Sequence, residues 1–170
     1  MLAGHVDDYV QELKRVGEVA FRKRHPTPML IVTGRATRGT RAGTDEDTRV
    51  TSVAKSGKHR ASLALVHRVF ALTKATHAPA GPVLVGRTTE NDVSIPEYSI
   101  SKRHCAFELR DGSMAVFDCG STNGTLLNGT RIEPDASIPL CGGEIITMGR
   151  FTFVYETAAG FLEFVSGLVK

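Results

Sequence analysis

The feature that most constrains the fold is a succession of short β-prone segments in the second half of the chain. They are separated by turn-forming residues, and two separators, Asp111-Gly112 and Asn128-Gly129, are dipeptides that two-residue hairpin turns prefer. Many short strands at this spacing predict an antiparallel β-sandwich or barrel. The segments are Leu63 to Leu72, Val83 to Val85, Val93 to Ile95, Cys105 to Arg110, Met114 to Asp118, Thr125 to Asn128, Glu144 to Met148 and Phe151 to Tyr155.

Both ends of the chain have a helical pattern instead. Residues 6–24 predict an amphipathic helix that ends before Pro26, because apolar residues recur at three- and four-residue steps. Those apolar residues are Val6, Val10, Leu13, Val16 and Ala20. Residues 29–32 are all apolar and predict a short buried strand, or a segment that docks on another apolar surface. The apolar residues between 161 and 168 predict a C-terminal helix.

These patterns divide the chain into four segments. We expect an N-terminal helix and short strand at residues 1–33, a flexible loop or linker at 34–61, a β-sandwich at 62–157 and a C-terminal helix at 158–170. The linker is rich in Gly, Thr, Ser, Arg and Lys and has almost no apolar residues. It contains Ser52-x-x-Lys55, a motif of penicillin-recognising enzymes, but without a helical pattern or the companion motifs, so we interpret the match as chance.

Composition excludes several classes of function. The 170 residues contain no apolar run long enough to cross a membrane and no visible signal peptide. The odd number of cysteines, without paired spacing, favours free thiols in a reducing cytoplasm over a disulfide scaffold or a metal site. Residues 1–80 carry a net charge of +7 and residues 81–170 one of −4, yet no aromatic residues lie among the basic ones. We therefore expect no nucleic-acid partner, membrane, metal or cofactor.

Polar residues at the turns are suited to hold a doubly charged tetrahedral anion beside a peptide. Loops at one end of a sandwich converge in space although they are distant in sequence. Arg87 follows a predicted strand and offers five donors in a planar fork that matches a phosphate group. Other turns supply short hydroxyl donors, a second cation, and an amide that both donates and accepts hydrogen bonds. The hydroxyl donors are Ser101 and Thr122, the second cation is Lys102, and the amide is Asn123.

The order and spacing of these motifs resemble the forkhead-associated (FHA) domain over about residues 64–156. The motifs are Gly86-Arg87, Ser101-x-x-His104, Ser121-Thr122-Asn123-Gly124-Thr125 and Asn128-Gly129. The resemblance implies an all-β fold, an FHA-like antiparallel β-sandwich of eleven strands, to which the present chain adds short flanking N- and C-terminal α-helices. It also implies a site for phosphothreonine peptides in loops at one end of the sandwich.

The resemblance further implies a role for each motif residue. Phosphopeptide contacts are expected from Arg87, Ser101, Lys102, Thr122 and Asn123. Structural support of the site is expected from Gly86, His104, Gly124 and Asn128. Ser99 stands where some relatives carry a basic residue that reads the peptide downstream of the phosphate, which weakens any preference for acidic peptides.

The implied function is that of a non-enzymatic, cytoplasmic adaptor in serine/threonine-kinase signalling. Its partner would be a phosphothreonine-containing protein or peptide, such as a kinase or its substrate. One alternative is a phosphate-independent docking or self-association module that uses the flanking helices. A hydrolase that uses Ser101 and His104 would lack a third group to orient the base. Phosphorylation of loop threonines would also allow self-association or autoinhibition, at Thr37, Thr40, Thr44, Thr48 or Thr51.

Overall fold

The computed structural model of this chain describes residues 3–36 and 65–169, and its strands form two packed sheets. The first sheet has the strand order β1-β3-β2-β12-β11-β8-β9 and the second has the order β10-β7-β6-β4-β5. Only β4 and β5 pair in parallel; the other described pairs are antiparallel. The predicted β-sandwich is confirmed; of its twelve described strands, β1 and β2 come from residues that precede the predicted sandwich at 62–157.

Most strands and both helices lie within the predicted segments, but β1, β9 and β10 were not predicted and β2 extends past residue 33 into the predicted linker. The first sheet contains β1 (Gly4–His5), β2 (Met29–Arg35), β3 (Arg68–Ala71), β8 (Thr125–Leu127), β9 (Thr130–Arg131), β11 (Ile145–Met148) and β12 (Phe151–Glu156). The second contains β4 (Val83–Gly86), β5 (Val93–Ser94), β6 (Cys105–Arg110), β7 (Ser113–Asp118) and β10 (Ile138–Leu140). The flanking helices are α1 (Val6–Arg24) and α3 (Ala158–Leu168).

Both predicted hairpin turns form. Asp111 and Gly112 have φ angles of 49° and 80°, and they connect β6 to β7 with Arg110 paired to Ser113. Asn128 and Gly129 have φ angles of 49° and 83° and connect β8 to β9 in the same way. Positive φ at both central residues is the geometry of a two-residue turn that matches the twist of its strands. These turns fix the registers of β7 and β8, the two strands that flank the loop at residues 119–124.

Strand β2 explains the uninterrupted apolar run at residues 29–32. Its side chains alternate between two hydrophobic clusters, because successive residues of a strand point to opposite faces. Leu30 and Val32 lie in the core between the two sheets, whereas Met29 and Ile31 lie in a second cluster on the outer face of the first sheet. β2 pairs with β3 on one side and β12 on the other. The chain before residue 37 therefore supplies an interior strand of the sandwich.

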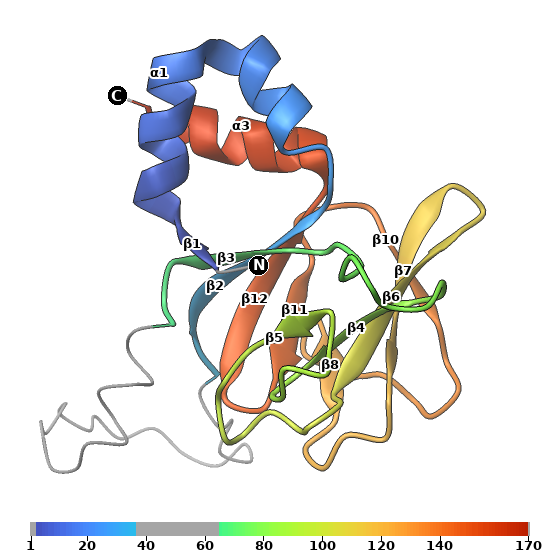
Figure 1. Cartoon of the computed structure of the whole chain (residues 1–170). Coiled ribbons are helices and arrows are strands. Elements are labelled where there is room, and N and C mark those ends of the chain that lie inside the picture. Colours follow the sequence, from blue (N-terminus) through green and yellow to red (C-terminus); the bar gives the residue numbers. More distant parts are fainter. Residues whose placement is uncertain (1–2, 37–64, 170) are drawn as a thin grey trace, which may run out of the picture.

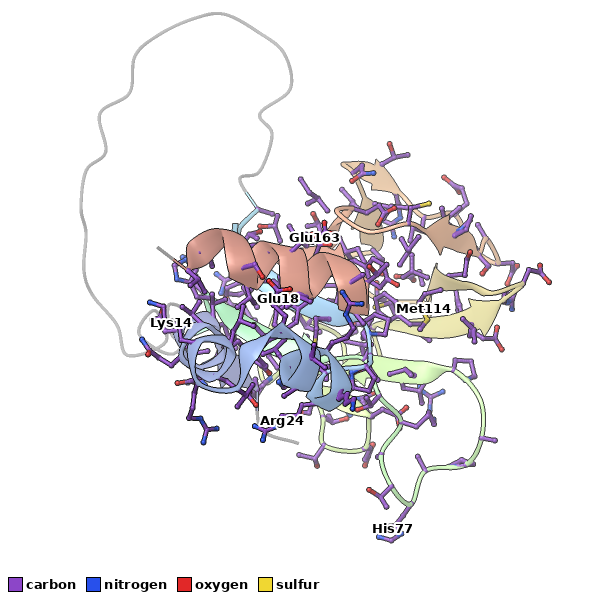
Figure 2. The ribbon with its side chains drawn as sticks, turned by 90° about the horizontal axis from the view of Figure 1, so that it is seen from above. Lys14, Glu18, Arg24, His77, Met114 and Glu163 are labelled. Carbon is purple, nitrogen blue, oxygen red and sulfur yellow. The ribbon has the colours of Figure 1, made fainter. Side chains whose placement is uncertain are left out.

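Helices α1 and α3 lie side by side (Figures 1 and 2) and pack on the outward-facing residues of β2 and β3, at one end of the first sheet. Their buried side chains include Leu13, Phe21 and Phe161, which pack with Met29 and Ile31 of β2. The confirmed helices differ from the prediction in one respect: α1 is kinked at Gly17. After the kink, Phe21 is fully buried, whereas Ala20 is half-buried.

Several sequence predictions concern residues that are not described. Residues 37–64, which include most of the predicted linker, lie outside the described part of the chain, as do Ser52-x-x-Lys55 and the five loop threonines. Among the described helices, none combines the length and the apolar character needed to cross a membrane.

Candidate functional site

Three loops at one rim of the sandwich meet around an open pocket of about 450 Å³. They follow β4, precede β6 and connect β7 to β8. The described residues that line the pocket include three cations and no carboxylate: Arg87, Tyr98, Ser99, Ile100, Ser101, Lys102, Arg103, Gly120, Thr122 and Asn123. All five residues predicted to contact a phosphopeptide are in this set. The fold thus brings them together, although their contact with a ligand remains a prediction.

Arg87 follows the end of β4, and no described residue neutralises its positive charge. Its backbone N–H donates to the carbonyl of Ser101 at 2.9 Å, which ties the two loops together. The side chain is half-buried, and its Nε has no hydrogen-bond partner in the described structure. No described carboxylate forms an ion pair with it. A half-buried guanidinium without a partner is arranged to accept an anion from outside the chain.

Ser101 and Thr122 place two hydroxyls next to each other across two loops. The Thr122 N–H donates to Ser101 Oγ at 3.0 Å, and the two hydroxyl oxygens lie 3.4 Å apart. This contact joins the loop before β6 to the loop after β7. Lys102 is exposed beside them, and its carbonyl accepts a hydrogen bond from Asn91 Nδ2 at 2.6 Å. The pocket therefore offers short hydroxyl donors together with the planar cation of Arg87 and the flexible cation of Lys102, which lie on separate segments.

Asn91 is a part of this site that the sequence analysis missed. It is 8% exposed, and its amide also donates to the Thr88 carbonyl at 2.9 Å, so it connects the Arg87 loop to the Ser101 loop. Gly86 allows the Arg87 loop and the Ser101 loop to approach each other closely. A Cβ at Gly86 would collide with the Lys102 carbonyl and lie 2.9 Å from Arg103 Cα. A glycine next to Arg87 is therefore required by space rather than by an unusual φ angle.

His104 is fully buried and braces the Ser101 loop from within. Its Nδ1 accepts the backbone N–H of Ser101 at 3.0 Å. Burial lowers the pKa of His104, and the Asp118 carboxylate and the Gly124 backbone oppose only part of that effect. Since Nδ1 binds the backbone, it is not available to accept the Ser101 hydroxyl proton. This geometry gives no support to the hydrolase alternative.

Two of the three cysteines, Cys105 and Cys119, also lack the features of nucleophiles. Burial raises the pKa of Cys105 and that of Cys119, so both thiols resist ionisation. A thiolate, not a thiol, is the reactive form. Within residues 3–36 and 65–169, no cluster of His, Cys, Asp or Glu side chains is arranged to hold a metal ion.

Asp118 organises the loop that carries Thr122 and Asn123, and it too was missed. Its carboxylate accepts hydrogen bonds from the Ser121 N–H at 2.8 Å, the Ser121 hydroxyl at 2.7 Å and the Thr125 hydroxyl at 2.6 Å. Burial alone would raise the pKa of Asp118, but these hydrogen bonds and nearby His104 leave it below its ordinary value. Aspartate side chains commonly bond nearby backbone N–H groups in turns, and this preference could have indicated the role of Asp118.

Asn123 is held at the rim of the pocket by a chain of contacts. Its Nδ2 donates to the Ser99 carbonyl at 2.9 Å, and its own carbonyl lies 3.5 Å from Arg131 Nη1. Gly124 has a φ of 77°, and a Cβ there would overlap the Arg131 guanidinium. Asn128 lies at the other end of β8, where its Oδ1 accepts the Ile145 N–H at 2.8 Å. Asn128 therefore supports the β8–β11 pairing rather than contacting Asn123 directly.

The buried imidazole predicts acid sensitivity. Because the pKa of His104 lies below 6.5 in the folded chain, the unfolded chain binds more protons as the pH falls through that value. The stability contribution is fully present above the unfolded pKa and declines as the pH falls towards the folded pKa. We expect the free energy of unfolding, measured in urea, to decrease between pH 7.5 and 5.5 (about one unit either side of the ordinary pKa). His104→Gln should weaken this pH dependence of the free energy of unfolding. An unchanged dependence in that variant would contradict the role assigned to His104.

Comparisons with known proteins match the same part of the chain. The family model described as the FHA domain matches residues 83–149. An FHA domain-containing protein of Arabidopsis thaliana is 34% identical over 79 residues, which are 46% of this chain and 20% of that protein. The oxoglutarate dehydrogenase inhibitor of Corynebacterium diphtheriae is 39% identical over 70 residues, 41% of this chain and 47% of that protein. The chain thus spans less than half the length of these relatives.

The solved structures agree on the fold. The solution structure of the FHA domain of an Arabidopsis thaliana hypothetical protein matches with a TM-score of 0.50 and 22% sequence identity. The match covers 78% of this chain and 86% of that one. This structural match covers more of the chain than the family model does. The family model matches only residues 83–149 and omits β2, β3 and β12.

Proposed function

We propose that this chain, which contains an FHA domain at residues 83–149, binds proteins phosphorylated on threonine through the pocket at the rim of its sandwich. FHA domains are interaction modules that use arginines to recognise phosphorylated motifs, not enzymes. The observation that carries the proposal is the half-buried Arg87 guanidinium without an ion-pair partner among the described residues. It lies in a pocket whose described lining contains no carboxylate.

The roles of the pocket residues follow from their chemistry. Arg87 would bind the phosphate in a bidentate manner, and the adjacent hydroxyls of Ser101 and Thr122 would donate to its remaining oxygens. Lys102 would add a mobile positive charge at the rim. Asn123, whose Oδ1 has no described partner, would accept a main-chain N–H of the peptide. This assignment accounts for the five predicted contacts without any group acting as a nucleophile.

The partners we propose are products of a serine/threonine kinase, either the kinase itself or one of its substrates. We also propose that the chain works in the cytoplasm as an adaptor. All three of its cysteines, Cys105, Cys119 and Cys141, are free thiols, which suits a reducing compartment.

Peptide titrations test this function. A phosphothreonine peptide should bind at least about a hundredfold more tightly than its unmodified form, because two charge-assisted hydrogen bonds contribute about 3 kcal/mol or more. The phosphoserine form should bind about fourfold more weakly than phosphothreonine, since one buried methyl group contributes about 0.8 kcal/mol. Calorimetry or fluorescence anisotropy would measure the three affinities. Equal affinity for all three peptides would overturn the proposal.

A further inference from the structure

Tyr98 is an exposed aromatic side chain at the pocket that the proposed phosphate contacts leave unused. It is 60% exposed, and it lines the same pocket as Arg87, Ser101 and Asn123. A large ring exposed beside a polar pocket offers apolar contact area with little loss of conformational freedom on binding.

The ring is held by a cation and a buried carboxylate. The Arg150 guanidinium lies over Tyr98, 4.2 Å from the ring centroid, within cation–π distance. Arg150 Nη2 in turn lies 3.2 Å from Glu97 Oε1, and the Glu97 side chain is only 6% exposed. The Arg150 side chain is itself 33% exposed and is committed to these two neighbours. Tyr98 is therefore a supported ring rather than a freely rotating one.

The same supports connect Tyr98 to the residue proposed to hold the peptide main chain. The Arg150 N–H donates to Ser99 Oγ at 3.1 Å, and the Ser99 N–H donates to Glu97 Oε1 at 3.2 Å. The Ser99 carbonyl accepts from Asn123 Nδ2 at 2.9 Å. The ring and the Asn123 amide are thus fixed to one segment of backbone. A peptide held by Asn123 would pass a ring whose position is set by the same contacts.

We infer that Tyr98 and Arg150 form a platform that selects phosphothreonine peptides with an aliphatic or aromatic side chain near the phosphothreonine. This inference rests on the proposed function. The ring offers an apolar surface, and the positive charge of the Arg150 guanidinium over one face would repel a basic peptide side chain. An acidic side chain would instead be directed to the cations Lys102 and Arg103. The platform is therefore a specificity determinant separate from the phosphate contacts.

A scanned peptide set tests the platform. The probe is a phosphothreonine in an otherwise all-alanine peptide, with each flanking position replaced in turn by Leu, Phe, Asp or Lys. We expect Leu or Phe at one position to raise the affinity about tenfold over alanine, equivalent to about 1.4 kcal/mol. This ratio should fall to about one in Tyr98→Ala and persist in Tyr98→Phe. Leu109→Ala is the matched control, because Leu109 is 68% exposed but lies outside the pocket.

The outcomes separate this inference from the proposed function. Absence of binding to every phosphothreonine peptide would overturn both. Phosphate-dependent binding that requires Arg87 but gains most from Asp would overturn the platform alone, as would a Leu or Phe preference that survives in Tyr98→Ala. A preference lost in Tyr98→Ala and kept in Tyr98→Phe and Leu109→Ala would support it.

Discussion

Replacing Arg87 with alanine is expected to lower the affinity for a phosphothreonine peptide by about a hundredfold or more. Each charge-assisted hydrogen bond contributes about 1.5–3 kcal/mol, and a guanidinium can donate two to one phosphate. The fold should survive, because Arg87 is half-buried and forms no ion pair with a described residue. Titration of modified and unmodified peptides against both proteins would measure the loss, with circular dichroism as the check on folding.

Two further variants sharpen this test. Arg87→Lys keeps the charge but loses the planar fork, so it should recover only part of the affinity. Arg110→Ala removes another guanidinium, one that lies on β6, outside the pocket, and pairs with Glu108 at 2.6 Å. Arg110→Ala should leave phosphopeptide affinity unchanged. A loss of equal size in Arg87→Ala and Arg110→Ala would indicate a general charge effect and contradict the assigned role.

Gly86→Ala is expected to destabilise the fold by about 3 kcal/mol, the upper part of the usual range for overpacking. The added methyl group would collide with the Lys102 carbonyl and would also lie 2.9 Å from Asn91 Nδ2. Neither neighbour can move cheaply, because backbone hydrogen bonds on both sides of Gly86 hold the two segments together. These are Arg87 N to the Ser101 carbonyl and His104 N to the Val85 carbonyl, each 2.9 Å.

Gly34→Ala is the control for that experiment. Gly34 also lies in a strand, but a Cβ there would have Thr152 Oγ1 as its nearest neighbour at 3.7 Å, an ordinary contact. Urea denaturation of both variants would give the free energies of unfolding. Equal stability of the two variants would show that the crossing of β4 and the Ser101 loop is looser than the structure indicates.

Much of the fold was predictable from the sequence because its signals are local. Alternating or continuous apolar runs and positive-φ dipeptides specify strands and turns within a few residues, as at Asp111-Gly112. The five proposed peptide contacts were predictable for a related reason, since they belong to short motifs. Their meeting in one pocket followed from the sandwich, whose loops converge at its rim.

The remaining features depend on contacts between distant residues. Tyr98 and Arg150 come from separate loops, and nothing in either local sequence reveals the stacked guanidinium. The kink at Gly17 interrupts the helical periodicity, and the regular pattern included Ala20 but not Phe21, which is buried. Asn91 has an ordinary sequence context, and its role arises only because two loops cross above Gly86.

The burial of the helix residues determines which substitutions can test the docking alternative. Leu13, an obvious apolar position of the N-terminal helix, is 6% exposed and packs in the cluster between the helices and the first sheet. A charge at Leu13 would therefore disturb the fold itself. Val19 and Phe164 are exposed at 75% and 36%, so charges at these two positions would test a helical interface without opening the core.

The insertion of β2 between β3 and β12 has a consequence for assembly of the domain. The first sheet cannot be completed until a strand from the beginning of the chain meets one from its end. Until then β3 and β12 would each present an unpaired edge, the kind of surface on which chains associate with one another. Such long-range closure slows folding. A shortened chain that starts after residue 36 would keep those edges permanently and is expected to aggregate.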